Sequence, residues 1–157
     1  MQHSVSKKTA MTTETSNATA EAEIRERMDH WLKAVRARDI AGIVSHYAPD
    51  ILAFDAIQQL QFKGVEAYRK HWEACLSMCP GTMIFEIHDL NIAASNDLAF
   101  CTFLNRCGTI EENGEEKAGW MRATVCYRKR HGKWTVVHEH FSAPFDMETL
   151  KVLDLKP

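Results

Sequence analysis

Residues Trp134-Thr135-Val136-Val137-His138-Glu139-His140-Phe141 have the β-branched and aromatic composition of a strand. Three longer runs in which side-chain character alternates precede them, at residues 82–94, 98–110 and 117–130. Turn sequences separate the four runs, and Asn113-Gly114 is the strongest hairpin signal among them. The C-terminal half is therefore predicted to be an antiparallel meander of four strands.

Upstream of the meander the spacing of apolar residues becomes helical. A first helix is expected from residue 21, a second short helix after Asp39, and a third after Gly64, with short strands at 51–55 and 59–63. The second helix is expected to end at Pro49. The apolar residues on the inner sides of these helices are Ile24, Met28, Trp31, Leu32, Val35; Ile40, Ile43, Val44, Tyr47; and Val65, Tyr68, Trp72, Cys75, Leu76, Cys79.

This order of elements predicts an α+β fold. A cone-shaped, curved antiparallel (mixed) sheet would wrap around three N-terminal helices and leave an internal pocket. Residues 1–20 carry no aromatic residue and are expected to form a disordered tail, followed by a single domain over 21–157.

The amino-acid composition limits the kinds of partner that the protein is expected to bind. The net charge of -2 gives no general attraction to nucleic acid or to an anionic membrane surface, and no apolar run is long enough to span a membrane. The five cysteines are odd in number and have no disulfide-like spacing, so reduced thiols in a cytoplasmic protein are expected.

Two stretches carry a resemblance to a known family: residues 47–64, with Tyr47-Ala48-Pro49-Asp50, and residues 132–144, with His138-Glu139-His140. With them the chain resembles the nuclear-transport-factor-2-like superfamily, which includes ketosteroid isomerases, SnoaL-like polyketide cyclases and the association domain of calcium/calmodulin-dependent kinase II. Tyr47-Ala48-Pro49-Asp50, followed by Asp55 and Gly64, is similar to the isomerase segment that carries the general base. Gly132-Lys133-Trp134, then His138-Glu139-His140, Ser142 and Pro144, is similar to the last hairpin of the kinase association domain.

Asp55 is the first candidate for chemistry. It follows an apolar stretch, and apolar walls raise the pKa of a carboxylate, so that it can remove a proton from carbon next to a carbonyl. The resemblance places the isomerase base at this position. The alternative is that Asp55 caps the turn that follows the strand.

The resemblance also implies groups that stabilise an enolate oxygen. In the isomerases these groups are a tyrosine on the first helix and a protonated aspartic acid on a late strand. The corresponding positions in this sequence are Trp31 and one next to Trp120. The indole N–H group of a tryptophan can donate a hydrogen bond but is a weaker acid than either of those groups. For Trp31, an ordinary core position is the favoured interpretation. Tyr47 is a further candidate ligand-binding residue. Arg122 either points to solvent or reaches into the pocket to bind a carboxylate or enolate.

The register of the last hairpin decides which polar residues face inward. Because successive side chains of a strand point to opposite faces, His138 and His140 are expected on the same face as Trp134, and Glu139 on the other face. A two-residue turn would put Glu139 on the same face as Arg122, and a three-residue turn would put the two histidines there. The isomerase offset favours Glu139 inward, and both alternatives remain open.

The candidate residues are compatible with two functions. The first is a cofactor-independent isomerase, cyclase or lyase in which Asp55, Arg122 and Glu139 act on a small apolar, carbonyl- or carboxylate-containing ligand. The second is a noncatalytic ligand-binding or oligomerisation module. Structural histidines are favoured over a metal site, so no metal is expected. A homodimer or higher homo-oligomer is expected because the outer sheet face would expose apolar residues.

Overall fold

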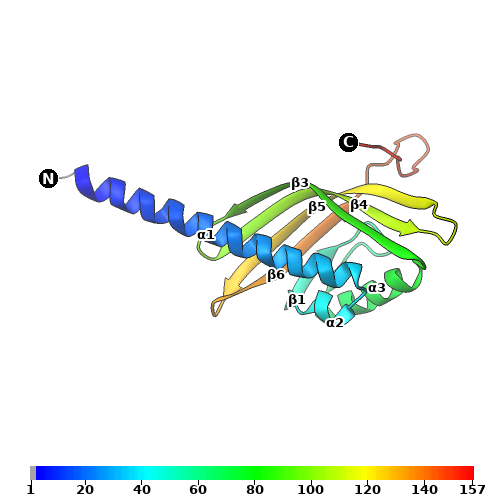
Figure 1. The fold of residues 1–157 in the computed structure, drawn as a ribbon, viewed down its shortest axis with the longest axis horizontal. Coiled ribbons are helices and arrows are strands. Elements are labelled where there is room, and N and C mark those ends of the chain that lie inside the picture. Colours follow the sequence, from blue (N-terminus) through cyan, green and yellow to red (C-terminus); the bar gives the residue numbers. More distant parts are fainter. Residues whose placement is uncertain (1–2) are drawn as a thin grey trace.

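The computed structural model describes the backbone from residue 3, and side chains at residue 11 and from residue 13. Six strands form one mixed, curved sheet in the order β2-β1-β6-β5-β4-β3, and three helices cover one face of it (Figure 1). The helices are α1 (His3–Arg36), α2 (Ile40–Val44) and α3 (Val65–Ser77). The strands are β1 (Tyr47–Phe54), β2 (Phe62–Lys63), β3 (Thr82–Ala94), β4 (Leu98–Ile110), β5 (Glu116–Arg130) and β6 (Lys133–Ser142).

The predicted α+β cone is therefore confirmed, and so is the four-stranded meander from β3 to β6. The sheet is mixed because β1 pairs in parallel with β6, while the other pairs are antiparallel. Alternate residues of each long strand point to the helices. On β5 the inward residues include Ala123, Val125 and Tyr127, each at most 4% exposed.

The hairpin between β5 and β6 has the two-residue turn, since Arg130 pairs with Lys133. His131 and Gly132 both have positive φ, as a tight hairpin turn requires. A β-bulge then leaves Val137 unpaired: Tyr127 lies opposite Val136, and Cys126 opposite His138. Before this bulge the even-numbered residues of β6 point inward, and after it the odd-numbered residues do.

The bulge corrects the expected faces of the last strand. Trp134 and Val136 are buried before it, and Glu139 and Phe141 are buried after it, so all four point to the helices. Val137, which would share a face with Glu139 in a regular strand, is the bulged residue. Of the two alternatives left open, the structure has the two-residue turn. Arg122 nevertheless pairs with Ser142 and lies on the opposite face from Glu139, because of the bulge.

The segment after α2 also differs from the prediction. The helix ends at Val44, and Tyr47 begins β1 instead of extending the helix, because it pairs with Val136 of β6. The backbone N–H of Val136 donates to the carbonyl of His46 at 2.9 Å, which fixes this parallel start. Pro49 lies inside β1, at a position where the pairing with β6 is irregular.

Helix α1 extends back to His3, where the sequence predicts a disordered tail over residues 1–20. Its first turns project beyond the sheet in Figure 1. Within this part the hydroxyl groups of Thr15 and Thr19 donate to carbonyl groups one helical turn earlier, and Ser16 donates to Asn96 at the β3–β4 turn. Among the side chains described, Ala20 is the first along α1 that is buried.

No helix in the described part of the chain is both long and apolar enough to cross a membrane. The residues that form the main core lie between the helices and the inner face of the sheet. One side of that core, near α3, is incompletely filled.

Candidate functional site

An apolar pocket of about 90 Å³ opens between α3 and the inner face of the sheet. Its only ionisable lining residues besides three cysteines, among the described residues, are Asp55 and His71. Five of its lining residues carry sulfur. The full lining consists of Asp55, Ile57, His71, Trp72, Cys75, Leu76, Cys79, Met83, Phe85, Cys107, Met121 and Phe141.

Asp55 and His71 form an ion pair at the wall of this pocket. His71 Nε2 lies 3.1 Å from Asp55 Oδ2, and the two side chains are 2% and 14% exposed. The other carboxylate oxygen of Asp55 accepts the backbone N–H of Ile57 at 3.1 Å. Asp55 thus caps the turn after β1, as one interpretation predicted, and it also lies at the pocket.

Burial works to lower the pKa of His71, but the hydrogen bond to Asp55 and the contact with Cys75 outweigh it. Together with the negative charge of Asp55 they raise the pKa of His71 to about 9. The imidazole ring stacks on Phe62 at 4.1 Å between ring centroids, and this contact fixes its orientation. At neutral pH the pocket wall therefore presents a protonated imidazole held by a carboxylate.

A second polar group lies deeper in the core. Glu139 is 1% exposed, and its Oε1 accepts hydrogen bonds from the hydroxyl groups of Tyr68 and of Tyr47, the latter at 3.1 Å. The Tyr47 oxygen in turn accepts the indole N–H groups of Trp31 at 3.1 Å and Trp72 at 3.0 Å. Trp72 is the member of this network that also lines the pocket.

Burial raises the pKa of Glu139 to about 7; the tyrosine hydrogen bonds oppose this rise and the charge of Asp55 adds to it. Glu139 does not line the pocket of Asp55. It lines a void of about 10 Å³ together with Trp31 and other core residues. The structure thus places Glu139, Tyr47 and Trp31 in one network behind the pocket.

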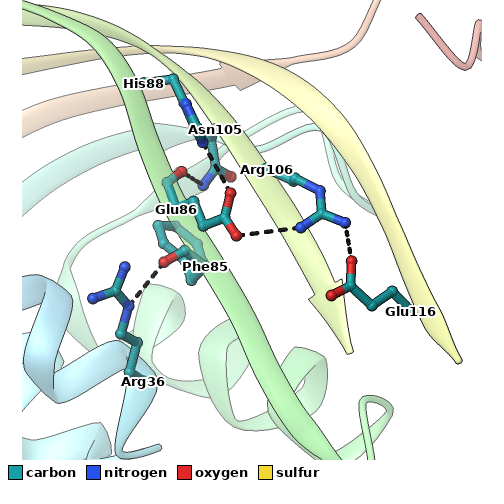
Figure 2. A network of polar contacts seen from close by, with 7 residues as sticks. All are labelled: Arg36, Phe85, Glu86, His88, Asn105, Arg106 and Glu116. Atoms are coloured by element: carbon teal, nitrogen blue, oxygen red, sulfur yellow. Dashed lines mark hydrogen bonds and ion pairs between the residues drawn. The ribbon is translucent and has the colours of Figure 1, made fainter. Parts of the chain in front are cut away.

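Strands β3 and β4 form part of the pocket wall, and the polar contacts shown in Figure 2 hold these two strands. Arg36 at the end of α1 donates to the carbonyl of Phe85 at 2.9 Å. Asn105 is fully buried and donates to the carbonyl of Glu86 at 3.0 Å. On the other side of β3, Arg106 bridges Glu86 and Glu116. These contacts fix Phe85 against the cavity.

Arg122 and Trp120 are not brought to the pocket. They lie on the outer face of β5, since their neighbour Met121 points inward to the pocket and Ala123 is buried. Arg122 is exposed there. Both residues line a separate outer hollow with the C-terminal residues Leu155, Lys156 and Pro157.

His138 and His140 also lie on the outer face, on either side of the inward Glu139. Both rings pack edge-on against Phe54 of β1, at 4.9 and 5.6 Å between centroids. His138 Nδ1 is 2.6 Å from the carbonyl oxygen of Leu52. In the described part of the chain, no three histidine, cysteine or acidic side chains are grouped as metal ligands.

Sequence reasoning missed His71, Tyr68 and Trp72 as site residues. His71 lies three residues after Tyr68 and four before Cys75, so it belongs to the inner stripe of α3. That position was the available signal: a histidine among the inward residues of an otherwise apolar helix face.

Residues 24–146 match the family model of the SnoaL-like domain. The match covers most of the chain, and the chain therefore belongs to the SnoaL-like domain family. Its fold is that of the nuclear-transport-factor-2-like superfamily. No curated protein sequence matches it.

Solved structures agree with this assignment. A nuclear-transport-factor-2-like protein of unknown function from Pseudomonas putida is 57% identical, with a TM-score of 0.82; the alignment covers 87% of this chain and 96% of that one. A proposed dehydratase of the same family from Streptomyces avermitilis has a TM-score of 0.70 at 12% identity, over 82% and 99% of the two chains. The association domain of C. elegans CaMKII has a TM-score of 0.61 at 16% identity, over 77% and 93%. The last two show a shared fold.

Proposed function

We propose that this protein is a cofactor-independent enzyme that transfers protons on a small carbonyl compound, in an isomerase- or dehydratase-type reaction. The observation that carries the proposal is the Asp55–His71 ion pair at the wall of an apolar pocket. A carboxylate and an imidazolium at such a wall provide a base and an acid in one place.

The two groups have complementary roles in this reaction. The Asp55 carboxylate accepts a proton from the carbon next to the carbonyl, because each of its oxygens retains a free lone pair beside the bonds it already accepts. The positive charge of His71 stabilises the enolate oxygen, and its proton completes the isomerisation or leaves with a hydroxyl group. The apolar walls strengthen both effects by excluding water.

Proton exchange tests this proposal without knowledge of the natural substrate. Small ketones such as cyclohexanone and diacetone alcohol, incubated in D₂O, should exchange their α-protons faster with the wild-type protein than in buffer, as followed by NMR. Asp55→Asn should lower that rate by about 10²-fold or more, the usual contribution of a positioned general base.

Asp50→Asn is the matched control, since Asp50 is an exposed residue of β1 that pairs with Arg130 at 3.6 Å. It should exchange the ketones at the wild-type rate. An Asp55→Asn protein as active as wild type, or a wild-type protein no faster than buffer, would overturn the proposal.

A second candidate is a noncatalytic ligand-binding or assembly module, favoured by the fold shared with the CaMKII association domain. It predicts that the pocket binds such ketones without exchanging their protons. Under either function we propose a cytoplasmic homodimer or larger homo-oligomer, since Leu98 and Phe100 are about half exposed on the outer face of β4.

A further inference from the structure

The pocket of Asp55 contains three thiols. Cys75 and Cys79 reach it from α3 and the residues that follow, and Cys107 reaches it from β4. All five cysteines of the chain are free. Acid/base chemistry on a carbonyl needs none of these thiols, so their presence in the pocket calls for a separate explanation.

Cys75 is the pocket thiol that contacts the ion pair. It lies four residues after His71 on α3, which places both side chains on the same helix face. Its Sγ is 3.6 Å from His71 Nε2 and 3.8 Å from Nδ1, and His71 Nε2 is 3.1 Å from Asp55. A thiol next to an imidazole that a carboxylate orients is the arrangement in which a neighbouring base activates a cysteine nucleophile.

The other thiols provide a contrast inside the same molecule. Burial, with smaller contributions from nearby charges, raises the pKa of Cys107 to about 11, although this residue lines the same pocket. Burial likewise raises the pKa of Cys101 to about 12, and it also raises the pKa of Cys126 on the outer face. These three thiols remain protonated at neutral pH and are poor nucleophiles.

We propose that Cys75 adds covalently to small α,β-unsaturated carbonyl compounds held in this pocket. The inference rests on the proposed function for the position of the carbonyl group, which lies against Asp55 and His71. A dehydration catalysed by that pair would itself produce an α,β-unsaturated carbonyl next to Cys75, so the same compound class is both the product of the pocket and the acceptor for its thiol.

The addition balances without any oxidant or reductant. The thiol gives its proton to the Asp55–His71 pair, and its Sγ forms a bond to the β-carbon of the acceptor. The carbon–carbon π bond breaks, and its electrons pass to the carbonyl oxygen as an enolate. The pair then returns one proton to the α-carbon, so that a thioether and a saturated carbonyl result.

Methyl vinyl ketone is a suitable probe, because it is small enough for a pocket of about 90 Å³. The wild-type protein is treated with it for short times, and the five cysteine peptides are quantified by mass spectrometry. Cys75 should be alkylated about tenfold faster than Cys79, Cys107 or Cys126, because it is the pocket thiol in contact with His71. Equal rates, or faster alkylation of another cysteine, would overturn the inference.

Two variants connect this reactivity to the pair. Asp55→Asn and His71→Gln should each slow the alkylation of Cys75 about tenfold, while the rate at Cys126 stays the same. Cys126→Ser, at a thiol on the outer face of β5, is the matched control and should leave the rate at Cys75 unchanged. Alkylation of Cys75 that is as fast in Asp55→Asn as in wild type would contradict the role of the pair.

The two proposals fail separately. Absence of ketone proton exchange in the wild-type protein would overturn the proposed function and leave selective alkylation of Cys75 intact as a thiol-addition site. Normal proton exchange with unselective alkylation would overturn only the role of Cys75. The comparison among thiols in the wild-type protein does not depend on the folding of any variant.

Discussion

Among single residues, Glu139 has the most unusual environment. It is a carboxyl group that is almost fully buried, and its described hydrogen-bond partners are the hydroxyl groups of Tyr47 and Tyr68. No ion pair to Glu139 occurs among the described residues. Its negative form is therefore disfavoured, which is why its pKa lies near 7 in the folded protein.

Replacement of Glu139 by glutamine should increase stability at high pH relative to low pH. The pKa is raised from 4.5 to about 7, so the stabilising contribution of Glu139 is complete below pH 4.5 and is lost as the pH rises through 7. The stability difference between Glu139→Gln and wild type should therefore grow by on the order of 3 kcal/mol between pH 4.5 and 8. Denaturant unfolding at several pH values measures it.

Glu112→Gln, in the exposed turn after β4, provides the control. Its stability difference from wild type should be the same at both ends of that pH range. A Glu139→Gln protein whose advantage does not change with pH would show that Glu139 does not titrate as the structure implies.

Single residues were also where sequence reasoning was least complete. Asp55 could be predicted because it follows an apolar strand and matches a family position. His71 could not be selected in the same way, because its role depends on a partner sixteen residues earlier in the chain that only the packing of α3 against β1 brings to 3.1 Å. Arg122 was assigned a possible pocket position that its exposed side of β5 does not allow.

At the level of strands, the meander was predictable because long alternating runs and hairpin turns are local signals. The bulge at Val137 was not, since an alternation of period two cannot show where one residue is left out of the pairing. This one residue decides that Glu139 faces the core while Arg122 faces outward.

The pairing of β4 with β5 leaves space for a side chain at one glycine and none at another. A Cβ at Gly108 of β4 would lie 1.9 Å from the carbonyl oxygen of Lys117 on the neighbouring strand, whereas a Cβ at Gly119 of β5 would meet nothing within 4 Å. Gly108→Ala should therefore destabilise the protein by about 1–3 kcal/mol, as overpacked sites do. Gly119→Ala should change stability by less than about 0.5 kcal/mol.

Chemical denaturation of the two alanine variants measures this difference. Equal stability of the two variants would mean that β4 and β5 are not paired as closely at Gly108 as the structure shows.

For the whole molecule, the outer sheet face has the character of an interface. Leu98 and Phe100 are 47% and 52% exposed, and they border an apolar hollow that also includes Val137. Apolar side chains gathered on one face favour association with a second copy.

Phe100→Glu should therefore shift the protein from an oligomer to a monomer at micromolar concentration, as measured by light scattering. Glu115→Lys, in the turn at the opposite end of β4, changes a charge without touching this face and should leave the mass unchanged. A wild-type monomer at the same concentration would contradict the proposed assembly.

The central claim is that Asp55 holds a protonated His71 at the pocket wall, and NMR titration of the His71 ring tests it most directly. Its signal is assigned by its absence in His71→Gln. The pKa should be about 9 in the wild-type protein and should fall well below that in Asp55→Asn, where burial dominates. A wild-type His71 that titrates at or below 6.5, or one unaffected by Asp55→Asn, would contradict the account.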